Sequence, residues 1–162
     1  MSDSTATAPI EIFVDADACP VKDEIYRVAF RYGIKVHVVS NAVMAIPADP
    51  LIERVVVDGG FDAADNWIAE RARPGTVVIS ADIPLAQRCL KAGAAVIGPT
   101  GRPFTMDSIG MAIAQRELMS QLRAMGEVTG GPKPMAKRDR SAFLSVLDET
   151  IVRLRRRKPP PA

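Results

Sequence analysis

Two aspartates follow the first apolar run of the chain, in a pattern that suits binding of a divalent metal ion. The apolar run is Ile12–Val14, and Asp15 and Asp17 come directly after it. A later apolar run, Val77–Ile79, is followed by Asp82. Carboxylates gathered in one place repel each other unless a cation neutralises them, and hard oxygen ligands select Mg²⁺ or Mn²⁺. We therefore expect a divalent-metal site if the fold brings these two segments together.

The elements that must position these aspartates alternate between short apolar strands and helices. The predicted strands are 10–14, 34–39, 54–57, 76–79 and 94–97, and the predicted helices are about 20–32, 63–72, 83–91, 106–125 and 139–156. This alternation predicts a single-domain, three-layer α/β/α fold with a mainly parallel five-stranded sheet. In the strand order 3-2-1-4-5, the first and fourth strands are neighbours at the switch point where ligands bind. That order would bring Asp15, Asp17 and Asp82 into one crevice.

A second group of acids follows the third predicted strand and would reach the same edge of the sheet. It consists of Asp58, Asp62 and Asp65. Asp65 falls inside a predicted helix, where aspartate is a mediocre helix former, so it is either solvent-facing or a ligand. Asp62 and Asp82 could each be a helix N-cap and nothing more. Asp58 fits the turn of an Asp-Gly-Gly sequence.

Basic residues flank a glycine- and proline-rich loop before the last predicted helix. The loop has the sequence Thr-Gly-Gly-Pro-Lys-Pro over residues 129–134. Backbone amides in such loops, and helix N-termini, bind phosphates, and nearby basic side chains hold a nucleic-acid backbone without reading its sequence. The alternative is an ordinary basic surface loop. The residues that we expect to contact nucleic acid are Thr129, Lys133, Lys137, Arg138 and Arg140.

The length of 162 residues predicts one domain, which we place at residues 10–157 between a disordered start (1–9) and a disordered Pro-rich tail (158–162). A hydrophobic fraction of 48% and a charged fraction of 25% are typical of soluble globular proteins. No apolar run approaches the roughly 20 residues of a membrane span, and the first nine residues lack the features of a secretory signal. Two cysteines do not make a disulfide framework. We expect a cytoplasmic protein.

The formal net charge of +2 conceals an uneven distribution. From Gly131 onward there are nine Lys and Arg against three Asp and Glu, whereas residues 1–130 carry twelve against sixteen. An acidic body with a basic C-terminal segment suggests an anionic partner that is steered towards an acidic, metal-filled centre. Alternatively, the basic run from Arg153 to Lys158 is only a solvated helix end.

Other residues with chemical potential are better explained by structure. Cys19 lies at a predicted helix N-terminus, where a thiolate would be favoured. A cysteine-loop phosphatase would need an arginine six residues later, but that position is Ile25. Cys89 falls on an apolar helix face, and His37 alternates within the second strand, so we expect both to be structural.

Four sequence runs carry a resemblance to a known family. They are Val14–Ile25 (VDADACPVKDEI), Asp58–Asp65 (DGGFDAAD), Ile79–Ala86 (ISADIPLA) and Thr129–Pro134 (TGGPKP). In this order they resemble the bacterial YaiI/YqxD family, built on domain of unknown function 188, over roughly residues 10–152. That family is in turn similar to the PIN-like nucleases. The resemblance implies a parallel sheet in the order 3-2-1-4-5 and acidic residues that bind Mg²⁺ or Mn²⁺ for phosphodiester hydrolysis.

The resemblance also implies roles for individual residues. Asp15 resembles the first-strand aspartate of PIN domains, and Asp65 resembles their mid-chain helical acid. The turn Ser80–Asp82 resembles the Ser/Thr-x-Asp that follows the fourth strand. Asp17 and the Cys19-Pro20 pair belong to the pattern of the smaller family and not to PIN domains generally.

Taken together, these features predict a metal-dependent nuclease or phosphodiesterase that acts on nucleic acid, RNA more than DNA. The residues expected to be catalytic and to bind Mg²⁺ or Mn²⁺ are Asp15, Asp17, Asp65 and Asp82. One alternative is a haloacid-dehalogenase-type phosphatase, in which Asp15 is the nucleophile and Asp17 the acid. Another is a non-catalytic RNA-binding protein that binds through its basic loop without a metal.

Overall fold

The protein forms one five-stranded sheet covered by helices on both faces. The structure is a computed structural model that describes residues 9–60, 62–126 and 135–157. All strand pairs are parallel and the strand order is β3-β2-β1-β4-β5, as predicted. The strands are β1 (Glu11–Asp15), β2 (Lys35–Ser40), β3 (Ile52–Val56), β4 (Thr76–Ile79) and β5 (Ala95–Ile97).

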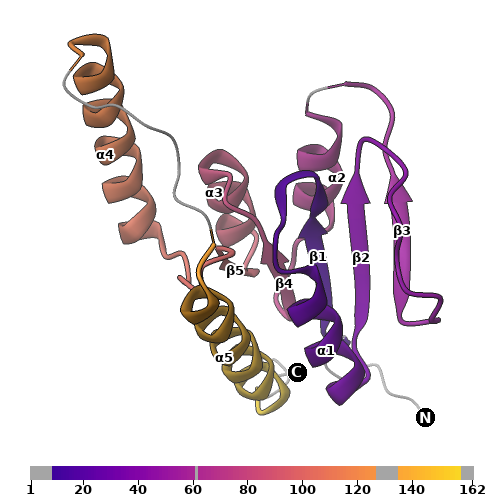
Figure 1. The fold of residues 1–162 in the computed structure, drawn as a ribbon. Helices are drawn as coiled ribbons and strands as arrows, with labels where there is room; N and C mark the ends of the chain where they lie inside the picture. Colours follow the sequence, from indigo (N-terminus) through magenta and orange to yellow (C-terminus); the bar gives the residue numbers. More distant parts are fainter. Residues whose placement is uncertain (1–8, 61, 127–134, 158–162) are drawn as a thin grey trace.

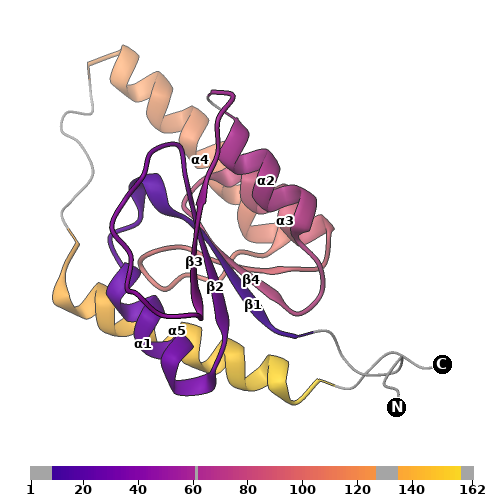
Figure 2. The ribbon, with the colours of Figure 1, turned by 90° about the vertical axis from the view of Figure 1, so that its right-hand side faces the viewer.

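The helices form the two outer layers of the fold (Figures 1 and 2). In chain order they are the 3₁₀ turn η1 (Ala16–Ala18), α1 (Lys22–Tyr32), α2 (Ala63–Arg71), α3 (Ile83–Lys91), α4 (Met106–Ala124) and α5 (Lys137–Arg155). Figure 2 shows α1 and α5 on one side of the sheet and α2, α3 and α4 on the other. Helices in the connections between parallel strands give this doubly covered arrangement, whereas β2 and β3 are joined without a helix.

Alternation along the central strands divides the core into two halves. Ile12 and Val14 of β1 are fully buried on the face that packs against α1 and α5, together with Phe143 of α5. Phe13 points to the opposite face and packs in a cluster with Ile68 of α2. Because both faces of the sheet are covered, the strands need continuous apolar runs and not simple alternation, which is the pattern in the sequence.

The C-terminal helix α5 is held on α1 by polar contacts as well as by the core. Tyr32 donates a hydrogen bond from its hydroxyl to Oδ1 of Asp148 at 2.7 Å, and the Arg31 guanidinium pairs with the other oxygen of the same carboxylate.

Gly101, in the turn after β5, lies against the backbone of Phe143 in α5. Its φ of +90° places it in the left-handed region, which glycine adopts without strain.

Helix α4 differs from the others in how little of it is covered. Ile109 near its N-terminus is buried, and α3 is the described element that packs most extensively against it. Figure 1 shows α4 standing at the outer edge of the molecule, away from α5. No helix in the described part of the chain combines the length and the apolar character needed to cross a membrane.

The predicted element boundaries agree with the structure to within two residues. Strand β4 and helix α3 have the predicted first and last residues. The 3₁₀ turn η1 was not predicted from the sequence. It forms because Asp15–Cys19 must turn away from the sheet before α1 begins, and Lys22 stabilises the turn by donating to the carbonyl oxygens of Ala16 and Cys19. The proposed disordered segments, 1–9 and 158–162, lie almost wholly outside the described residues.

Candidate functional site

Asp15 is the last residue of β1, the central strand of the sheet. Its Oδ2 atom accepts a hydrogen bond from the hydroxyl of Ser80 at 2.9 Å. Burial raises the pKa of the Asp15 carboxyl, and the hydrogen bond from Ser80 acts against this. The charges of Asp82 and Asp17 raise the pKa further. Asp15 is therefore a partly buried carboxyl whose negative charge is poorly compensated by its protein neighbours.

Ser80 and Asp82 form the turn that joins β4 to α3. The hydroxyl oxygen of Ser80 accepts the backbone N–H of Asp82 at 3.0 Å. Oδ1 of Asp82 accepts the N–H of Leu85 at 2.9 Å and so caps the N-terminus of α3. The N-cap explanation for Asp82 is confirmed, but capping occupies only one carboxylate oxygen. Asp82 also lines a cavity, so it can have a second role.

That cavity lies at the carboxyl ends of β1 and β4, which are adjacent strands in the sheet. It has a volume of about 350 Å³. Its lining residues are Asp15, Cys19, Ile79, Ser80, Ala81, Asp82, Ile83, Pro99 and Arg116. We call it the acidic cavity. Of the three acids predicted to share this crevice, the structure places Asp15 and Asp82 in the cavity lining but not Asp17.

Asp65, in the first turn of α2, is electrostatically linked to this cavity although it does not line it. Burial raises the pKa of Asp65 to about 6, helped by the charges of Asp82, Asp15 and, more weakly, Asp62. Arg88 partly offsets the effect. A carboxyl with a pKa near 6 is unusual, since an unperturbed aspartate titrates near pH 4. Strongly perturbed carboxyls in a cleft are candidates for functional residues.

Asp17 is placed differently from the other predicted ligands. It is exposed, lies in η1, and its carboxylate accepts the backbone N–H of Asn41 at 3.2 Å. It is not among the residues that line the acidic cavity. Asp17 therefore connects the ends of β1 and β2, while its charge still contributes to the raised pKa of Asp15.

The basic residues predicted to bind nucleic acid lie only partly in the described structure. Thr129 and Lys133 are outside the described residues. Lys137 and Arg138 are exposed at the start of α5. Arg140 donates from Nη1 to the carbonyl oxygen of Pro20 at 2.7 Å and lies 3.5 Å from a carboxylate oxygen of Glu24. Its guanidinium is thus partly committed to joining α5 to the start of α1.

Arg116, on α4, is a site residue that sequence reasoning missed. It is exposed, lines the acidic cavity, and has no hydrogen bond or ion pair with the residues that the structure describes. Its spacing from Ile109 and Ile113 places it on the side of α4 that faces the body. The sequence did contain a signal for Arg116, because it lies on the same helical face as the apolar residues Ile109 and Ile113.

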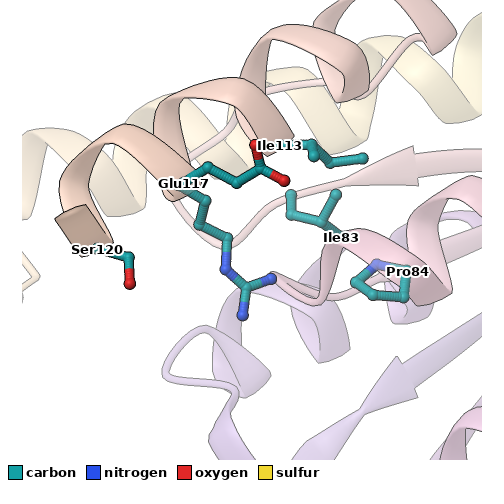
Figure 3. Close-up of a pocket in the computed structure, with 6 residues that line it drawn as sticks. Ile83, Pro84, Ile113, Glu117 and Ser120 are labelled. Atoms are coloured by element: carbon teal, nitrogen blue, oxygen red, sulfur yellow. The ribbon is translucent and has the colours of Figure 1, made fainter.

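An apolar groove adjoins the acidic cavity and shares two of its residues (Figure 3). Its volume is about 400 Å³, and its lining residues are Ile83, Pro84, Ile113, Arg116, Glu117 and Ser120. Figure 3 shows Ile113 of α4 next to Ile83 at the start of α3. Ile83 and Arg116 belong to both spaces, so the apolar groove opens directly beside the acidic cavity.

Cys19 lines the acidic cavity but is buried, and burial raises the pKa of its thiol. A raised pKa opposes thiolate formation, so the structure does not favour Cys19 as a nucleophile. His37 is structural, as expected. Its two ring nitrogens lie 2.8 Å from a carboxylate oxygen of Glu11 and 2.9 Å from one of Glu53, on the two neighbouring strands.

The donor atoms around the acidic cavity fit Mg²⁺ or Mn²⁺ better than a softer metal. The lining carboxylate oxygens and the Ser80 hydroxyl are hard ligands, and burial raises the pKa of the Cys19 thiol, which opposes the thiolate form that a softer metal would need. Within the described ranges, no three His, Cys, Asp or Glu side chains converge into a ready coordination group. Mg²⁺ commonly uses one or two carboxylates and completes its shell with water and substrate phosphate. Asp15 and Asp82 suit that mode of binding.

Comparison of the sequence with known protein families places the chain in one of them. The sequence profile described as "Uncharacterized BCR, YaiI/YqxD family" (DUF188) matches residues 13–153, which is most of the chain. The chain belongs to the YaiI/YqxD family. The acidic cavity, with Asp15, Ser80 and Asp82, lies entirely within the part of the chain that matches the family.

Relatives within the family are similar along nearly their whole length. UPF0178 protein bll3966 of Bradyrhizobium diazoefficiens is 63% identical over 93% of this chain and 90% of its own. A UPF0178 protein of Rhodopseudomonas palustris strain HaA2 is 59% identical over 97% of this chain and 96% of its own. One from Nitrobacter winogradskyi is 62% identical over 91% of this chain and 94% of its own. No solved structure shows a significant match to this family member.

Proposed function

We propose that this YaiI/YqxD-family protein is a divalent-metal-dependent phosphodiesterase or nuclease that acts on RNA or another nucleic acid. The observation that carries the proposal is that Asp15 and Asp82 line one cavity at the ends of β1 and β4, with Ser80 bonded to Asp15 between them. The edge where the winding of a parallel sheet reverses is the usual ligand site in such folds. Among the described residues that line the cavity, Arg116 is the one basic side chain, and it forms no ion pair with Asp15 or Asp82.

Asp15 and Asp82 would hold Mg²⁺ or Mn²⁺, with Asp65 as a further carboxylate beside them. Such an ion polarises a phosphoryl oxygen and lowers the pKa of a bound water when it is present. The bond from the Ser80 hydroxyl fixes the orientation of the Asp15 carboxylate. A bound cation would also favour the ionised form of Asp65, whose pKa of about 6 reflects burial first and the charges of the neighbouring carboxylates second.

Arg116 would pair with a phosphate of the substrate at the rim of the cavity. A guanidinium is suited to phosphate because its planar group donates to two oxygens at once. Lys137 and Arg138, exposed at the N-terminus of α5, would contact the backbone farther along the strand. The roles proposed for Thr129 and Lys133 rest on their sequence alone. The resemblance to PIN-like nucleases, which share the strand order 3-2-1-4-5, agrees with this assignment.

The two alternatives have less support. The haloacid-dehalogenase mechanism needs Asp17 beside Asp15 as a general acid, but the Asp17 carboxylate accepts the N–H of Asn41 and lies outside the cavity lining. A non-catalytic RNA-binding protein would have no need for partly buried carboxyls whose charges oppose an anionic ligand.

The decisive experiment measures the effect of Mn²⁺ on the melting temperature. At a hundredfold excess over the dissociation constant, we expect wild-type protein to melt about 5–10 °C higher than without metal. The double variant Asp15→Asn with Asp82→Asn should lose this rise, whereas Asp107→Asn on α4 should keep it. Both variants remain close in shape to the wild type, and asparagine still caps α3.

Cleavage of an end-labelled single-stranded RNA in Mn²⁺ tests the activity itself. We expect cleavage by the wild type and by Asp107→Asn, and at least about a thousandfold slower cleavage by the double variant. A Mn²⁺ response that is unchanged in the double variant would reject the proposed ligands. Metal binding without cleavage of any RNA or DNA oligonucleotide would reject the nuclease while leaving the metal site.

A further inference from the structure

Helix α4 carries apolar side chains on the face that points away from the rest of the protein. Met111 is 75% exposed, Leu118 54% and Met125, just past the helix end, 67%. Large apolar side chains scattered singly on a surface are ordinary, but here three occur at a constant spacing of seven residues. We call these residues, with Leu122 between the last two, the α4 seam.

The α4 seam is separate from the contact between α4 and α3. At 3.6 residues per turn, Leu118 lies on the side of the helix opposite Ile109, which is buried, and Ile113, which lines the groove against α3. Figure 3 shows Ile113 next to Ile83 at the start of α3. Figure 1 shows α4 as the outermost element, with no described element on its far side. A helix with apolar residues on two opposite faces needs a second partner.

The arrangement of residues along α4 is self-complementary. Consider two copies of α4 that pack antiparallel, with the two-fold axis passing at Leu118. A residue that lies n positions before Leu118 in one copy then faces the residue that lies n positions after Leu118 in the other. Met111 then faces Met125 of the second copy, Ala114 faces Leu122, and Gln115 faces Gln121. Small residues meet large ones, the amides can hydrogen-bond to each other, and no pair places like charges together. A two-fold interface requires a surface that complements itself in this way.

We infer that the protein forms an antiparallel, two-fold symmetric dimer through the α4 seam, with a second copy of this chain as the partner. The stretch from Met111 to Met125 forms a face about 22 Å long and 10 Å wide, so pairing two such faces covers roughly 440 Å² in projection, which is below the size of a stable specific interface and fits a weak, transient one. We therefore expect a dissociation constant in the micromolar range and not a permanent dimer.

A lipid surface is a poorer partner for α4 than a second copy. Helices that lie on membranes carry a strongly basic polar face. The four charged residues of α4 are Asp107, Arg116, Glu117 and Arg123, which sum to zero. Their neutrality removes the attraction to anionic lipid but imposes no repulsion between two identical helices.

Sedimentation velocity of the full-length protein over a dilution series from high-micromolar to sub-micromolar tests the inference. We expect a reversible monomer–dimer equilibrium for the wild type. Leu118→Glu should weaken it by at least a hundredfold, because it places two carboxylates opposite each other on the two-fold axis. Glu117→Gln, one residue away, should leave it unchanged. Since Leu118 is exposed, the circular dichroism spectrum and melting temperature of monomeric Leu118→Glu should match those of the wild-type monomer.

Cysteine cross-linking tests the orientation of the helices. Leu118→Cys alone should cross-link to itself under mild oxidation, and an equal mixture of Met111→Cys and Met125→Cys should give mainly the mixed pair. Ser120→Cys, on the side facing the groove against α3, should not cross-link. A wild-type protein that stays monomeric at high concentration, a dimer that resists Leu118→Glu, or self-pairing of Met111→Cys would each overturn the inference.

Discussion

Replacement of Asp82 by asparagine should make the metal-free protein more stable, although it removes a charged group from the candidate site. Asparagine retains the shape of the side chain and caps a helix as well as aspartate does, so the bond to Leu85 is preserved. What it removes is a negative charge that raises the pKa of Asp65 and, to a smaller extent, that of Asp15. The folded protein should gain the free energy that this repulsion costs.

The magnitude follows from the titration of Asp65. Its pKa in the fold is about 6, against an ordinary aspartate value of 3.8, so the folded state binds the proton more tightly than the unfolded chain. The resulting cost to stability is fully present above pH 6, shrinks as the pH falls, and is absent below pH 3.8. At 1.36 kcal/mol for each pKa unit, the cost is at most about 3 kcal/mol. Screening at this incompletely buried carboxyl reduces it to about 1 kcal/mol.

Burial is the largest cause of the raised pKa, and Asp15 and Asp62 contribute as well, so Asp82→Asn should recover less than half of that cost, or a few tenths of a kcal/mol, on the order of 0.3. The recovered stability corresponds to a rise of about 1 °C in melting temperature for a domain of this size. The assay is thermal unfolding without metal at pH 8 and at pH 4, with Asp107→Asn as the matched loss of charge outside the site. We expect the gain of Asp82→Asn at pH 8 and its disappearance at pH 4. A gain that is equal at both pH values, or a loss at pH 8, would refute the electrostatic reasoning.

Three further substitutions test other contacts. Ser80→Ala removes the donor to Asp15, and we expect about tenfold weaker Mn²⁺ binding in calorimetry with little change in fold. Gly101→Ala should lower the unfolding free energy in urea by at least about 2 kcal/mol, because a Cβ there would lie 2.8 Å from the backbone nitrogen of Phe143. His37→Ala should cost about 1 kcal/mol in the same measurement, because it removes the ring that bridges Glu11 and Glu53, although Glu53 is half exposed and Glu11 keeps its bond to Arg73. Wild-type Mn²⁺ affinity in Ser80→Ala would contradict the role of its bond to Asp15. Wild-type stability in Gly101→Ala or His37→Ala would contradict the contact that the substitution changes.

The sequence alone was sufficient to predict the architecture, because strand and helix patterns are local. Apolar runs such as Val77–Ile79 are short and unbroken, as in strands buried on both faces, and the residues after them mark where the strands end. Right-handed crossovers only reduced the possible topologies to a few, and the order 3-2-1-4-5 was an assumption that the family resemblance also implied; it was correct. The turn η1 was missed because it depends on hydrogen bonds from Lys22 to backbone oxygens, which no periodic pattern records.

Helices α4 and α5 show where sequence patterns no longer predict tertiary contacts. The sequence predicted a helix over about residues 106–125, but the apolar residues of α4 lie on two opposite faces, and only the packing against α3 shows which face is covered. Arg140 was assigned to nucleic acid from its position beside a loop. In the fold its guanidinium reaches back to the carbonyl of Pro20, more than a hundred residues earlier in the chain.

The sequence by itself determined that Asp15 and Asp82 stand at strand ends, because a strand of a parallel sheet delivers its last residue to one edge whatever surrounds it. Only the tertiary structure decided which charges share a cavity. It brought Arg116 to the rim from a distant helix, turned Asp17 to the backbone of Asn41, and left Asp65 beside the cavity with a raised pKa. Burial and Coulomb interactions act through space and depend on distances between elements, which the order of residues along the chain does not contain.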